Sequence, residues 1–587
     1  MKKFSTFILC VLTVLMISGC MNSQPLVDEL FSCYTEDQNG HQIKGFYSEK
    51  DQQWFLFLTS VQNMEEVVVN LEGKIKKASN GSLDTKNNTL THAFKKSGDQ
   101  VVLTTQNGNE IIISAYQSQL PSVYIDLNET TLDEIHVDKN NKFEGNSVYI
   151  YDLDEEFDLC VENTVQIKGR GNSTWRNYEK KAYQIKFEEK TSVMGMEKAK
   201  KWVLMANASD DSMIRTKLVY DTAEKMDFDF VTEMKYVDLW IEGDYRGTFM
   251  IGEKVEPGNG RLELSHEAGA LFEDDQAFFE EEDYWFVNEE LNRIFTMKEI
   301  NEEEYAYEAI DDFNNSLGAF VRYLYSTPSN EVTVDDLSRM IDVDSFVKYY
   351  VINEFVLNQE SFLTCFYWYK DGPADVIHLG PIWDYDTCMG NDGVDASEIL
   401  GTKQIIFRYL LACEEFHQLT EDAYQQYQSL LFSMDNLAKK LTEDISTSAI
   451  MNYYRWNVLG KVNPKGGLDF GNSFSEASDT LYQWLNNREI SFVLADSSVV
   501  TSVVSPEQKI LSLYFCDEND YETMDIAVWS QINGQDDLIW YQAEKKEDGS
   551  WVLDVDLRQH KGEGLYHIAA YPDGRTSNEF TGLCYVE

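Results

Sequence analysis

Short runs of alternating apolar and polar residues fill the first part of the chain. The runs "QQWFLFLTS", "EEVVVNLEG", "QVVLTTQNG" and "NEIIISAYQ" are separated by turn signals such as Asn-Gly and Ser-Gly at short, regular intervals. Alternation with a period of two places one face of each strand in a core and the other in water. The pattern therefore predicts a small all-β sandwich over residues 21–118.

The pattern changes near "LPSVYIDL", where mixed strands and helices begin and continue to about residue 495. One helix is well specified, because Asp342 can act as its N-cap and Phe346, Tyr349, Tyr350 and Phe355 follow at helical spacing. After the polar link "ADSSVV", the runs "MDIAVWS", "DLIWYQA", "SWVLDVDL" and "LYHIAAY" predict a second all-β domain over residues 503–587. The fold class predicted is α+β, with all-β domains at both ends of the chain.

The chain is strongly acidic, with a formal net charge of −52 over 587 residues. This charge repels nucleic acid and anionic lipid, so nucleic-acid binding is excluded. The most acidic run, "LFEDDQAFFEEEDYWF", lacks the spacing of an EF-hand calcium loop. We interpret it as a partly buried strand pair with a solvated acidic loop.

The N-terminus has the pattern of a secretion signal. Met-Lys-Lys precedes an apolar run from Phe7 to Met16 that is too short for a membrane span, and Ile-Ser-Gly-Cys20 follows. This ending resembles a bacterial lipobox, which implies that residues 1–20 are a lipoprotein signal and that a lipid on Cys20 is the protein's only attachment to the membrane. We therefore expect the chain on the extracellular face of the bacterial membrane, in the cell envelope; ordinary secretion is the alternative.

Seven cysteines follow Cys20, with no Cys-x-x-Cys pair among them. An odd number without close pairs indicates neither a zinc site nor a dense disulfide framework. Cys516 and Cys584 could bridge the last domain, but buried free thiols are the favoured interpretation.

A glycine-rich turn separates two alternating segments in "VQIKGRGNSTWRNYEKKAYQIKF". Gly-x-Gly lets backbone N–H groups close on phosphate oxygens because no Cβ intervenes. The turn is not a Walker A loop, and we do not expect it to open a helix, so a purely structural hairpin is the alternative. The next strand favours phosphate, because Lys180, Lys181 and Lys186 are clustered in an acidic chain and Lys186 is placed mid-strand, where an ammonium needs an anionic partner. Protein kinases place a strand lysine beneath a glycine-rich hairpin to hold phosphates.

A second candidate site lies in "GPIWDYDTCMGN". Asp384 and Asp386 are expected to alternate on a strand, and a glycine four residues later lets the backbone turn away. Two carboxylates this close repel each other unless a cation lies between them, so the pattern favours a hard divalent metal over a plain surface strand.

Longer motifs resemble the spore coat protein H (CotH) kinase family. The segments "VQIKGRGNSTW", "KKAYQIKF", "MGMEKAKKWVLMANASDDSMIRTKLVYDTA", "VDLWIEGDYRGTFMIGEKV", "GPIWDYDTCMGN" and "LYQWLNNREISF" follow the order of the family's elements. The resemblance implies an atypical, bilobal protein-kinase-like core over residues 119–495. It also implies phosphorylation of protein serines with ATP and a divalent metal, Mg²⁺ or Mn²⁺.

The resemblance assigns roles to individual positions. It implies a nucleotide under the hairpin, with Lys186 on the phosphates and Glu253 of "FMIGEKV" near the adenine or ribose, and it gives the metal to Asp384 and Asp386. The helix from Ser212 into Lys225 would stand where kinases keep the helix that orients the strand lysine. The implied nucleotide-binding residues are Arg170, Gly171, Asn172, Ser173, Thr174, Lys186 and Glu253.

One position departs from the family pattern. Where the family usually has Asn-x-Asp at the catalytic position, this chain has Asn358-Gln359-Glu360. Glutamate keeps the charge but is one methylene longer, and transfer chemistry tolerates little displacement. Glu360 could still accept a hydroxyl proton or reach the metal, or it could mark a member that transfers nothing.

The C-terminal runs resemble the group B streptococcal (Bsp-like) surface-protein repeat, through Ala-Val-Trp-Ser, Asn-Gly-Gln-Asp-Asp-Leu, Trp-Tyr and Tyr-His-Ile in order. The resemblance implies an envelope module, and exposed tryptophans would allow it to bind cell-wall carbohydrate. At strand positions, Trp529, Trp540 and Trp551 are more often core residues.

These patterns together predict a lipid-anchored kinase that phosphorylates a surface or coat protein, with Lys186 and Glu360 as its catalytic residues. The alternative is a non-catalytic protein of the envelope or coat that keeps the kinase-like core for binding or assembly.

Overall fold

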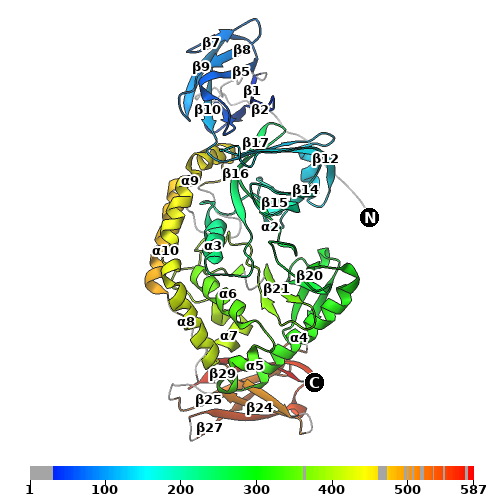
Figure 1. Ribbon diagram of the computed structural model, residues 1–587. Coiled ribbons are helices and arrows are strands. Elements are labelled where there is room, and N and C mark those ends of the chain that lie inside the picture. The colour runs from blue at the N-terminus through cyan, green and yellow to red at the C-terminus, as the bar shows by residue number, and fades with distance from the viewer. Residues whose placement is uncertain are drawn as a thin grey trace, which may run out of the picture.

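The structure is a computed structural model, which describes residues 31–360, 365–459, 472–492, 494, 499, 501–505, 508–515, 521–532, 534–546, 549–574 and 580–586. Four regions follow one another from one end of the molecule to the other (Figure 1). They are two N-terminal β sheets, a closed β barrel, a region of sheet and helices, and two C-terminal β sheets. The predicted signal and Cys20 lie outside the described residues. Among the helices that the structure describes, none is long and apolar enough to cross a membrane.

The N-terminal region consists of two five-stranded sheets, which confirms the strands predicted from the alternating runs. Their strand orders are β2-β1-β5-β8-β7 and β3-β4-β10-β9-β6, and Leu56, Val69 and Leu103 belong to a core that both sheets share. The strands are β1 (Ser32–Glu36), β2 (Gln42–Lys44), β3 (Phe46–Ser48), β4 (Gln53–Leu58), β5 (Val67–Glu72), β6 (Ile75–Ala78), β7 (Ser82–Asp84), β8 (Thr89–His92), β9 (Asp99–Thr105) and β10 (Glu110–Gln117).

The second region is a closed barrel, which β11 completes by pairing in parallel with β16. On β14, Tyr183, Ile185 and Phe187 are buried in the barrel core, so the alternate residues Gln184 and Lys186 face outward. The strand order is β11 (Ser122–Asp126), β12 (Phe143–Tyr151), β13 (Leu159–Arg170), β14 (Ala182–Thr191), β15 (Ala199–Met205), β17 (Asp244–Glu253) and β16 (Met234–Ile241). The helices α1 (Leu132–Val137), α2 (Ser173–Asn177) and α3 (Arg215–Glu224) lie in its connections.

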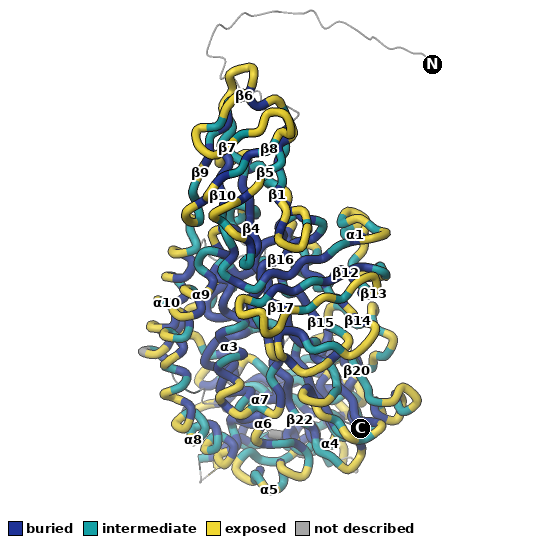
Figure 2. Tube along the Cα trace, turned by 45° about the horizontal axis from the view of Figure 1, so that its top comes forward, coloured by how far each residue is buried: buried dark blue, intermediate teal, exposed yellow. Residues whose placement is uncertain are grey.

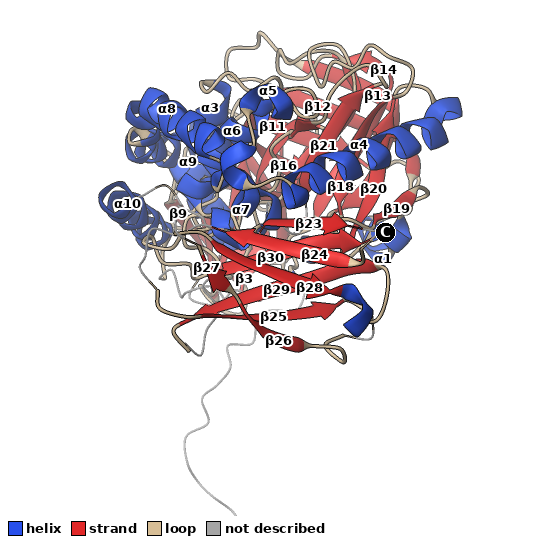
Figure 3. Cartoon of the chain, turned by 90° about the horizontal axis from the view of Figure 1, so that it is seen from below, coloured by secondary structure: helices blue, strands red, loops and turns tan. Residues whose placement is uncertain are grey.

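The third region joins a sheet to most of the helices. The sheet order is β19 (Trp285–Asn288), β20 (Arg293–Ile300), β18 (Gly269–Asp274), β21 (Phe366–Asp371) and β22 (His378–Leu379). The helices are α4 (Ala306–Ser326), α5 (Val334–Leu337), α6 (Val343–Val356), α7 (Ile405–Leu411), α8 (Glu414–Leu431), α9 (Met434–Arg455) and α10 (Phe474–Ser491). Figure 3 shows α8, α9 and α10 gathered on one side of the molecule, away from β19 and β20.

The acidic run from Leu271 to Phe286 differs from our interpretation of it. It contains the last part of β18 and the start of β19, but these strands do not pair with each other, because β20 lies between them. Its acidic residues are also not all solvated, since Glu273, Asp274 and Asp275 are buried.

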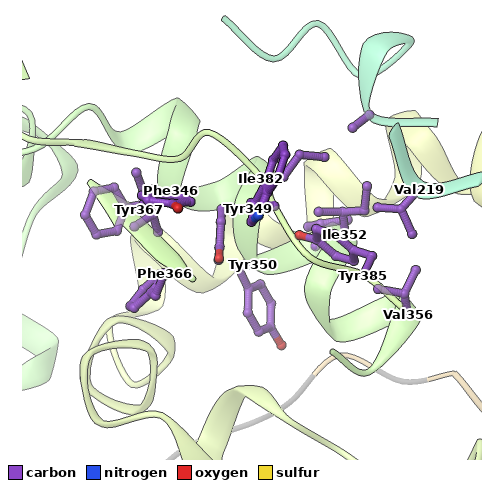
Figure 4. Close-up of a cluster of buried hydrophobic side chains, with 14 of the residues drawn as sticks. Val219, Phe346, Tyr349, Tyr350, Ile352, Val356, Phe366, Tyr367, Ile382 and Tyr385 are labelled. Atoms are coloured by element: carbon purple, nitrogen blue, oxygen red, sulfur yellow. The ribbon is translucent and has the colours of Figure 1, made fainter. Parts of the chain in front are cut away.

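Helix α6 begins where the sequence predicts. The side chain of Asp342 accepts a hydrogen bond from the Ser345 N–H at 3.0 Å, as an N-cap does. Phe346, Tyr349 and Tyr350 are buried, and Figure 4 shows them in a cluster of hydrophobic side chains from several segments. The helix ends at Val356, and its C-cap Leu357 has a left-handed φ of 51° that turns the chain toward Asn358 and Glu360.

Helix α9 connects the upper three regions. Ser448 donates a hydrogen bond to the buried Asp238 of the barrel at 2.5 Å, and Trp456 donates one to the Arg246 carbonyl at 2.8 Å. Tyr454 stacks on Phe55 of the N-terminal sheets, with ring centroids 4.3 Å apart.

Figure 2 shows buried residues in the middle of the molecule and exposed turns at the N-terminal sheets.

The C-terminal region again consists of two sheets, as predicted. The strand order of one sheet is β23 (Thr501–Ser505), β24 (Ile510–Phe515), β28 (Trp551–Asp556) and β27 (Glu544–Lys545). The strand order of the other sheet is β26 (Ile539–Gln542), β25 (Met524–Ser530), β29 (Gly564–Pro572) and β30 (Phe580–Val586). Cys584 is a buried free thiol in the described part of the chain, whereas Cys516 lies outside it. Trp551 is buried and Trp540 is 56% exposed, so the tryptophans divide between core and surface.

Candidate functional site

A cleft of about 780 Å³ lies between the barrel and the sheet of the third region. Its walls come from the turn after β13, from residues 205–209 after β15, from the segment after β17 and from β18, β20 and the loop around residue 384. This volume falls within the range of roughly 300–1,000 Å³ that small-molecule and cofactor sites occupy. Polar and charged side chains predominate in the lining.

The glycine-rich turn forms one wall of the cleft, and Arg170, Gly171, Asn172, Ser173 and Thr174 all line it. Gly171 has a φ of +88°, which favours glycine. The one-turn helix α2 follows it, so our expectation that the turn opens no helix was wrong.

The preceding glycine, Gly169, is packed tightly. A Cβ at this position would lie 2.4 Å from the ring of Trp175 and 2.7 Å from the Cα of Lys139. The backbone therefore approaches its neighbours more closely than any residue with a side chain would allow.

Basic side chains line the cleft from several segments, including Lys139 in the loop after α1. Lys168 and Arg170 come from the end of β13, Lys254 follows β17, and Lys298 comes from β20. Burial, together with the charge of Arg170, lowers the pKa of Lys168. Burial and the neighbouring Lys201 lower the pKa of Lys254 to about 7.

Lys298 is held differently, by two carboxylates. Its Nζ lies 3.1 Å from Glu273 Oε2 and also contacts Glu282. Burial opposes its charge, but these two carboxylates outweigh that effect and raise the pKa of Lys298. Glu273 also accepts a hydrogen bond from the Cys365 N–H at 2.9 Å, which fixes this wall of the cleft to β21.

Three carboxylates gather at the lower wall of the cleft, from Glu360, Asp384 and Asp386. One oxygen of each lies within 4.8 Å of the others, a spacing that a single cation can bridge. The Ser209 hydroxyl donates a hydrogen bond to Asp386, and Asn391 Nδ2 donates to the Asp386 carbonyl at 2.5 Å. The structure therefore brings Glu360 together with the two aspartates assigned to the metal, but it does not bring Lys186, the other residue predicted to be catalytic, to this cluster.

The loop that carries Asp384 and Asp386 is not the strand that the sequence predicts. β22 ends at Leu379, and Asp384 has a left-handed φ of 64° that interrupts the extended backbone. Tyr385 anchors the loop, because it is fully buried and donates a hydrogen bond to Asn353 Oδ1 of α6 at 2.9 Å. Figure 4 shows Tyr385 beside Ile352 and Val356 of α6.

A buried arginine fixes the end of the same loop. Arg215 at the start of α3 donates to the Cys388 carbonyl at 3.0 Å and pairs with Asp210. Arg215 is 1% exposed, so this contact is shielded from water. The helix expected over Ser212 to Lys225 is α3, and it begins at Arg215.

Two residues implied by the resemblance do not line the cleft. Lys186 is exposed on the outer face of β14, paired in register with Gln166 and Lys201. Glu253 is buried on the other side of its segment, where it accepts a hydrogen bond from the Glu233 N–H at 3.0 Å and lies 3.6 Å from Arg261. The next residue, Lys254, reaches the cleft instead.

Several lining residues were not expected from the sequence. Glu273 and Asp275 belong to the acidic run, and Lys254 adjoins the predicted Glu253. A charged residue at a buried strand position is the signal that could have identified Glu273. Ser209 also lines the cleft, and its place in "NASDDS", within a segment that resembles the family, is the signal that could have identified it.

Comparison with known families agrees with the motifs. A family profile described as CotH kinase protein matches residues 167–491, which is more than half of the chain. A profile described as GBS Bsp-like repeat matches residues 514–584, on the C-terminal sheets. None of the curated proteins compared with the chain matches it.

Proposed function

Because this chain belongs to the CotH kinase protein family, we propose that it is an atypical protein kinase that transfers the γ-phosphoryl group of ATP to a protein hydroxyl. The observation that carries the proposal is that the turn from Arg170 to Thr174 and the carboxylates of Glu360, Asp384 and Asp386 face one cleft. In this proposal the barrel and the helical region are the two lobes of a kinase-like core.

The cleft residues fit the nucleotide that the family implies. The turn offers backbone N–H groups where a Cβ is absent, and Lys168, Lys254 and Lys298 add positive charge in an otherwise acidic chain. Three carboxylates supply the oxygen ligands that Mg²⁺ or Mn²⁺ prefers. When bound, ATP supplies the phosphoryl group and the cation neutralises the charge that develops on it.

The chain's own residues contribute mainly by binding and orientation. Ser209 and Asn391 hold Asp386 in place, and Tyr385 holds the loop against α6. The lysine that carries phosphate is Lys254 or Lys298 rather than Lys186, because both of these line the cleft. Their ammonium groups are donors for oxygens that gain charge during transfer.

The position of Glu360 supports a metal ligand more than a free base. Its carboxylate lies within 4.8 Å of those of Asp384 and Asp386, where a shared cation would engage it. To accept a hydroxyl proton, the carboxylate would have to turn away from this cluster, and its extra methylene relative to aspartate allows that turn.

We also propose a location and a class of substrate. The N-terminal pattern supports a lipid anchor on Cys20 at the extracellular face of a bacterial membrane, so the acceptor would be a surface or coat protein. The C-terminal sheets would contact the cell wall, and the exposed Trp540 offers a ring on which a sugar could stack.

The second candidate is a non-catalytic envelope protein that uses the kinase-like core for binding or assembly. Glu360 in place of the family's aspartate favours this candidate. It predicts that the chain binds no nucleotide, or binds it without transfer.

Calorimetric titration of ATP into the chain lacking residues 1–20, with and without Mn²⁺, tests the proposal. We expect binding that depends on Mn²⁺, that Asp386→Ala abolishes and that the exposed Asp395→Ala leaves intact. Labelled ATP then tests transfer to surface proteins. Absence of ATP binding in every condition would reject the proposed kinase activity and favour the non-catalytic envelope protein.

A further inference from the structure

A second group of metal-ligating side chains lies outside the cleft. It consists of Asp229 in the loop after α3, Asp342 at the N-cap of α6 and His378 at the start of β22. The Nδ1 atom of His378 lies 3.6 Å from Asp342 Oδ2 and 3.9 Å from Asp229 Oδ2. None of these residues lines the cleft described above.

These distances are too long for hydrogen bonds but suit two ligands of one ion. An N···O hydrogen bond spans about 2.7–3.2 Å, and among the described residues the buried Nδ1 of His378 has no hydrogen-bond partner. Zinc–ligand bonds of about 2.0–2.1 Å at tetrahedral angles separate the ligand atoms by about 3.4 Å. The three ligand atoms all lie within 4.8 Å of one another, so small side-chain movements would let one ion touch all of them.

The surroundings of His378 orient its Nδ1 toward the two carboxylates. Its Nε2 lies 3.2 Å from Asp375 Oδ2 and 3.3 Å from Oδ1, on the far side of the ring. The ring stacks on Tyr369, with centroids 4.6 Å apart at 14°. A carboxylate behind the second ring nitrogen is the usual partner of a metal-bound histidine, because it fixes the tautomer and strengthens the ligand.

The two aspartates are held as well. The Tyr369 hydroxyl donates to Asp229 Oδ2 at 2.8 Å, and the Ser345 N–H donates to Asp342 Oδ2 at 3.0 Å. Each carboxylate oxygen keeps lone pairs beyond that single hydrogen bond. The ligand set is therefore oriented by residues that do not themselves need the metal.

The group opens onto a cavity of about 730 Å³, which Asp229, Asp375 and His378 help to line. An ion can enter from this cavity, and a fourth position remains for water. One imidazole with two carboxylates suits Zn²⁺ better than Mg²⁺ or Ca²⁺, which take oxygen ligands. We propose that Asp229, Asp342 and His378 bind one Zn²⁺, with Asp375 as the carboxylate that orients the histidine.

This ion would join three segments that are distant in the sequence. They are the loop after α3, the start of α6 and β22, and β22 leads directly into the loop with Asp384 and Asp386. Binding to the folded state alone stabilises that state, so zinc at about 100 times its Kd should raise the Tm by a few degrees.

Zinc titration of the chain lacking residues 1–20, after removal of metal with EDTA, tests the proposal by calorimetry and by metal analysis. The Asp386→Ala background removes the carboxylate site in the cleft, and one equivalent of Zn²⁺ should still bind. In that background, His378→Ala should weaken binding more than 100-fold and Asp375→Asn about 10- to 100-fold. His417→Ala, in α8, is the matched histidine control and should change nothing.

Asp229→Asn covers the case in which His378→Ala does not fold. The Asp229 side chain is 64% exposed, and asparagine can still accept the Tyr369 hydrogen bond, so this variant should fold and lose at least tenfold in zinc affinity. If the Asp386→Ala chain takes up no zinc, or if Asp229→Asn and His378→Ala both bind it as the parent does, the proposal is overturned. In the first case, His378 is only an ion-pair partner of the surrounding aspartates.

Discussion

The low pKa of Lys254 predicts that nucleotide binding depends on pH in a specific way. Burial and the charge of Lys201 lower this pKa to about 7, and Arg170 and Lys298 act in the same direction. Two carboxylates oppose this effect only in part, because Lys254 shares both of them with Lys201. Lys254 pairs with Glu299, which lies 3.7 Å from Lys201, and Glu256 lies 3.1 Å from Lys201. Without ligand, Lys254 is therefore charged below pH 7 and increasingly neutral above it.

A bound polyphosphate would reverse this shift, because a neighbouring negative charge favours the ammonium form. With an initial pKa of about 7, binding should take up about half a proton at pH 7 and about 0.9 at pH 8. Affinity should fall about fivefold between pH 7 and pH 8 and approach a tenfold fall per pH unit, about 1.4 kcal/mol, at higher pH. Below pH 6.5 it should be nearly constant, because Lys254 is already charged.

Calorimetry of ATP with Mn²⁺ from pH 6.5 to 8.5, in buffers of different ionisation enthalpy, measures both the affinity and the proton uptake. In Lys254→Met, the fall of ATP affinity with pH that Lys254 causes should disappear. The same variant should weaken ATP binding at pH 6.5 by about tenfold or more, the value of one charge-assisted hydrogen bond. Lys298→Met should weaken binding but keep the slope, because Glu273 and Glu282 keep that lysine charged. Lys186→Met, outside the cleft, should change neither. A slope that persists in Lys254→Met would refute the reasoning.

Two further variants test the packing that supports the site. The side chain of Arg488 is 1% exposed, donates hydrogen bonds to backbone carbonyls at the end of α6 and pairs with the buried Glu354. Arg488→Met leaves that carboxylate without its partner and should lower the free energy of unfolding by about 3–5 kcal/mol. Urea denaturation measures this loss, with Arg339→Met as the control. The ion pairs of Arg339 are exposed and should contribute less than about 1 kcal/mol. Equal losses of unfolding free energy in the two variants would contradict the argument. Gly169→Ala places a Cβ against backbone, so it should lower the free energy of unfolding by about 1–3 kcal/mol and weaken ATP binding. Gly258→Ala is the control, because its Cβ would have no contact closer than 3.8 Å, and it should change neither.

Local structure was readable from the sequence where neighbouring residues decide it. The N-cap of α6 depends on Asp342 and on an N–H three residues later, so a short motif predicts it. Alternating strands were readable for the same reason. The closure of the barrel was not, because it depends on the pairing of β11 with β16, which lie far apart in the chain.

The candidate site was readable in part. Asp384 and Asp386 could be found because two close carboxylates signal a cation wherever the loop runs, even though the loop is no strand. Lys186 and Glu253 could not be placed correctly. Whether a strand residue reaches a cleft depends on how far along the strand the cleft extends, and β14 meets it at Gln184 but not at Lys186.

The sequence by itself determined the chemical groups of this protein: a glycine turn that permits close backbone approach, paired carboxylates, an acidic surface and the family to which the chain belongs. Only the tertiary structure decided which charges meet. It brings Lys298 to Glu273, Lys254 to the cleft, and His378 to two aspartates from separate segments. The physical reason is that charges interact through distances in space, and these depend on long-range packing that no short pattern specifies.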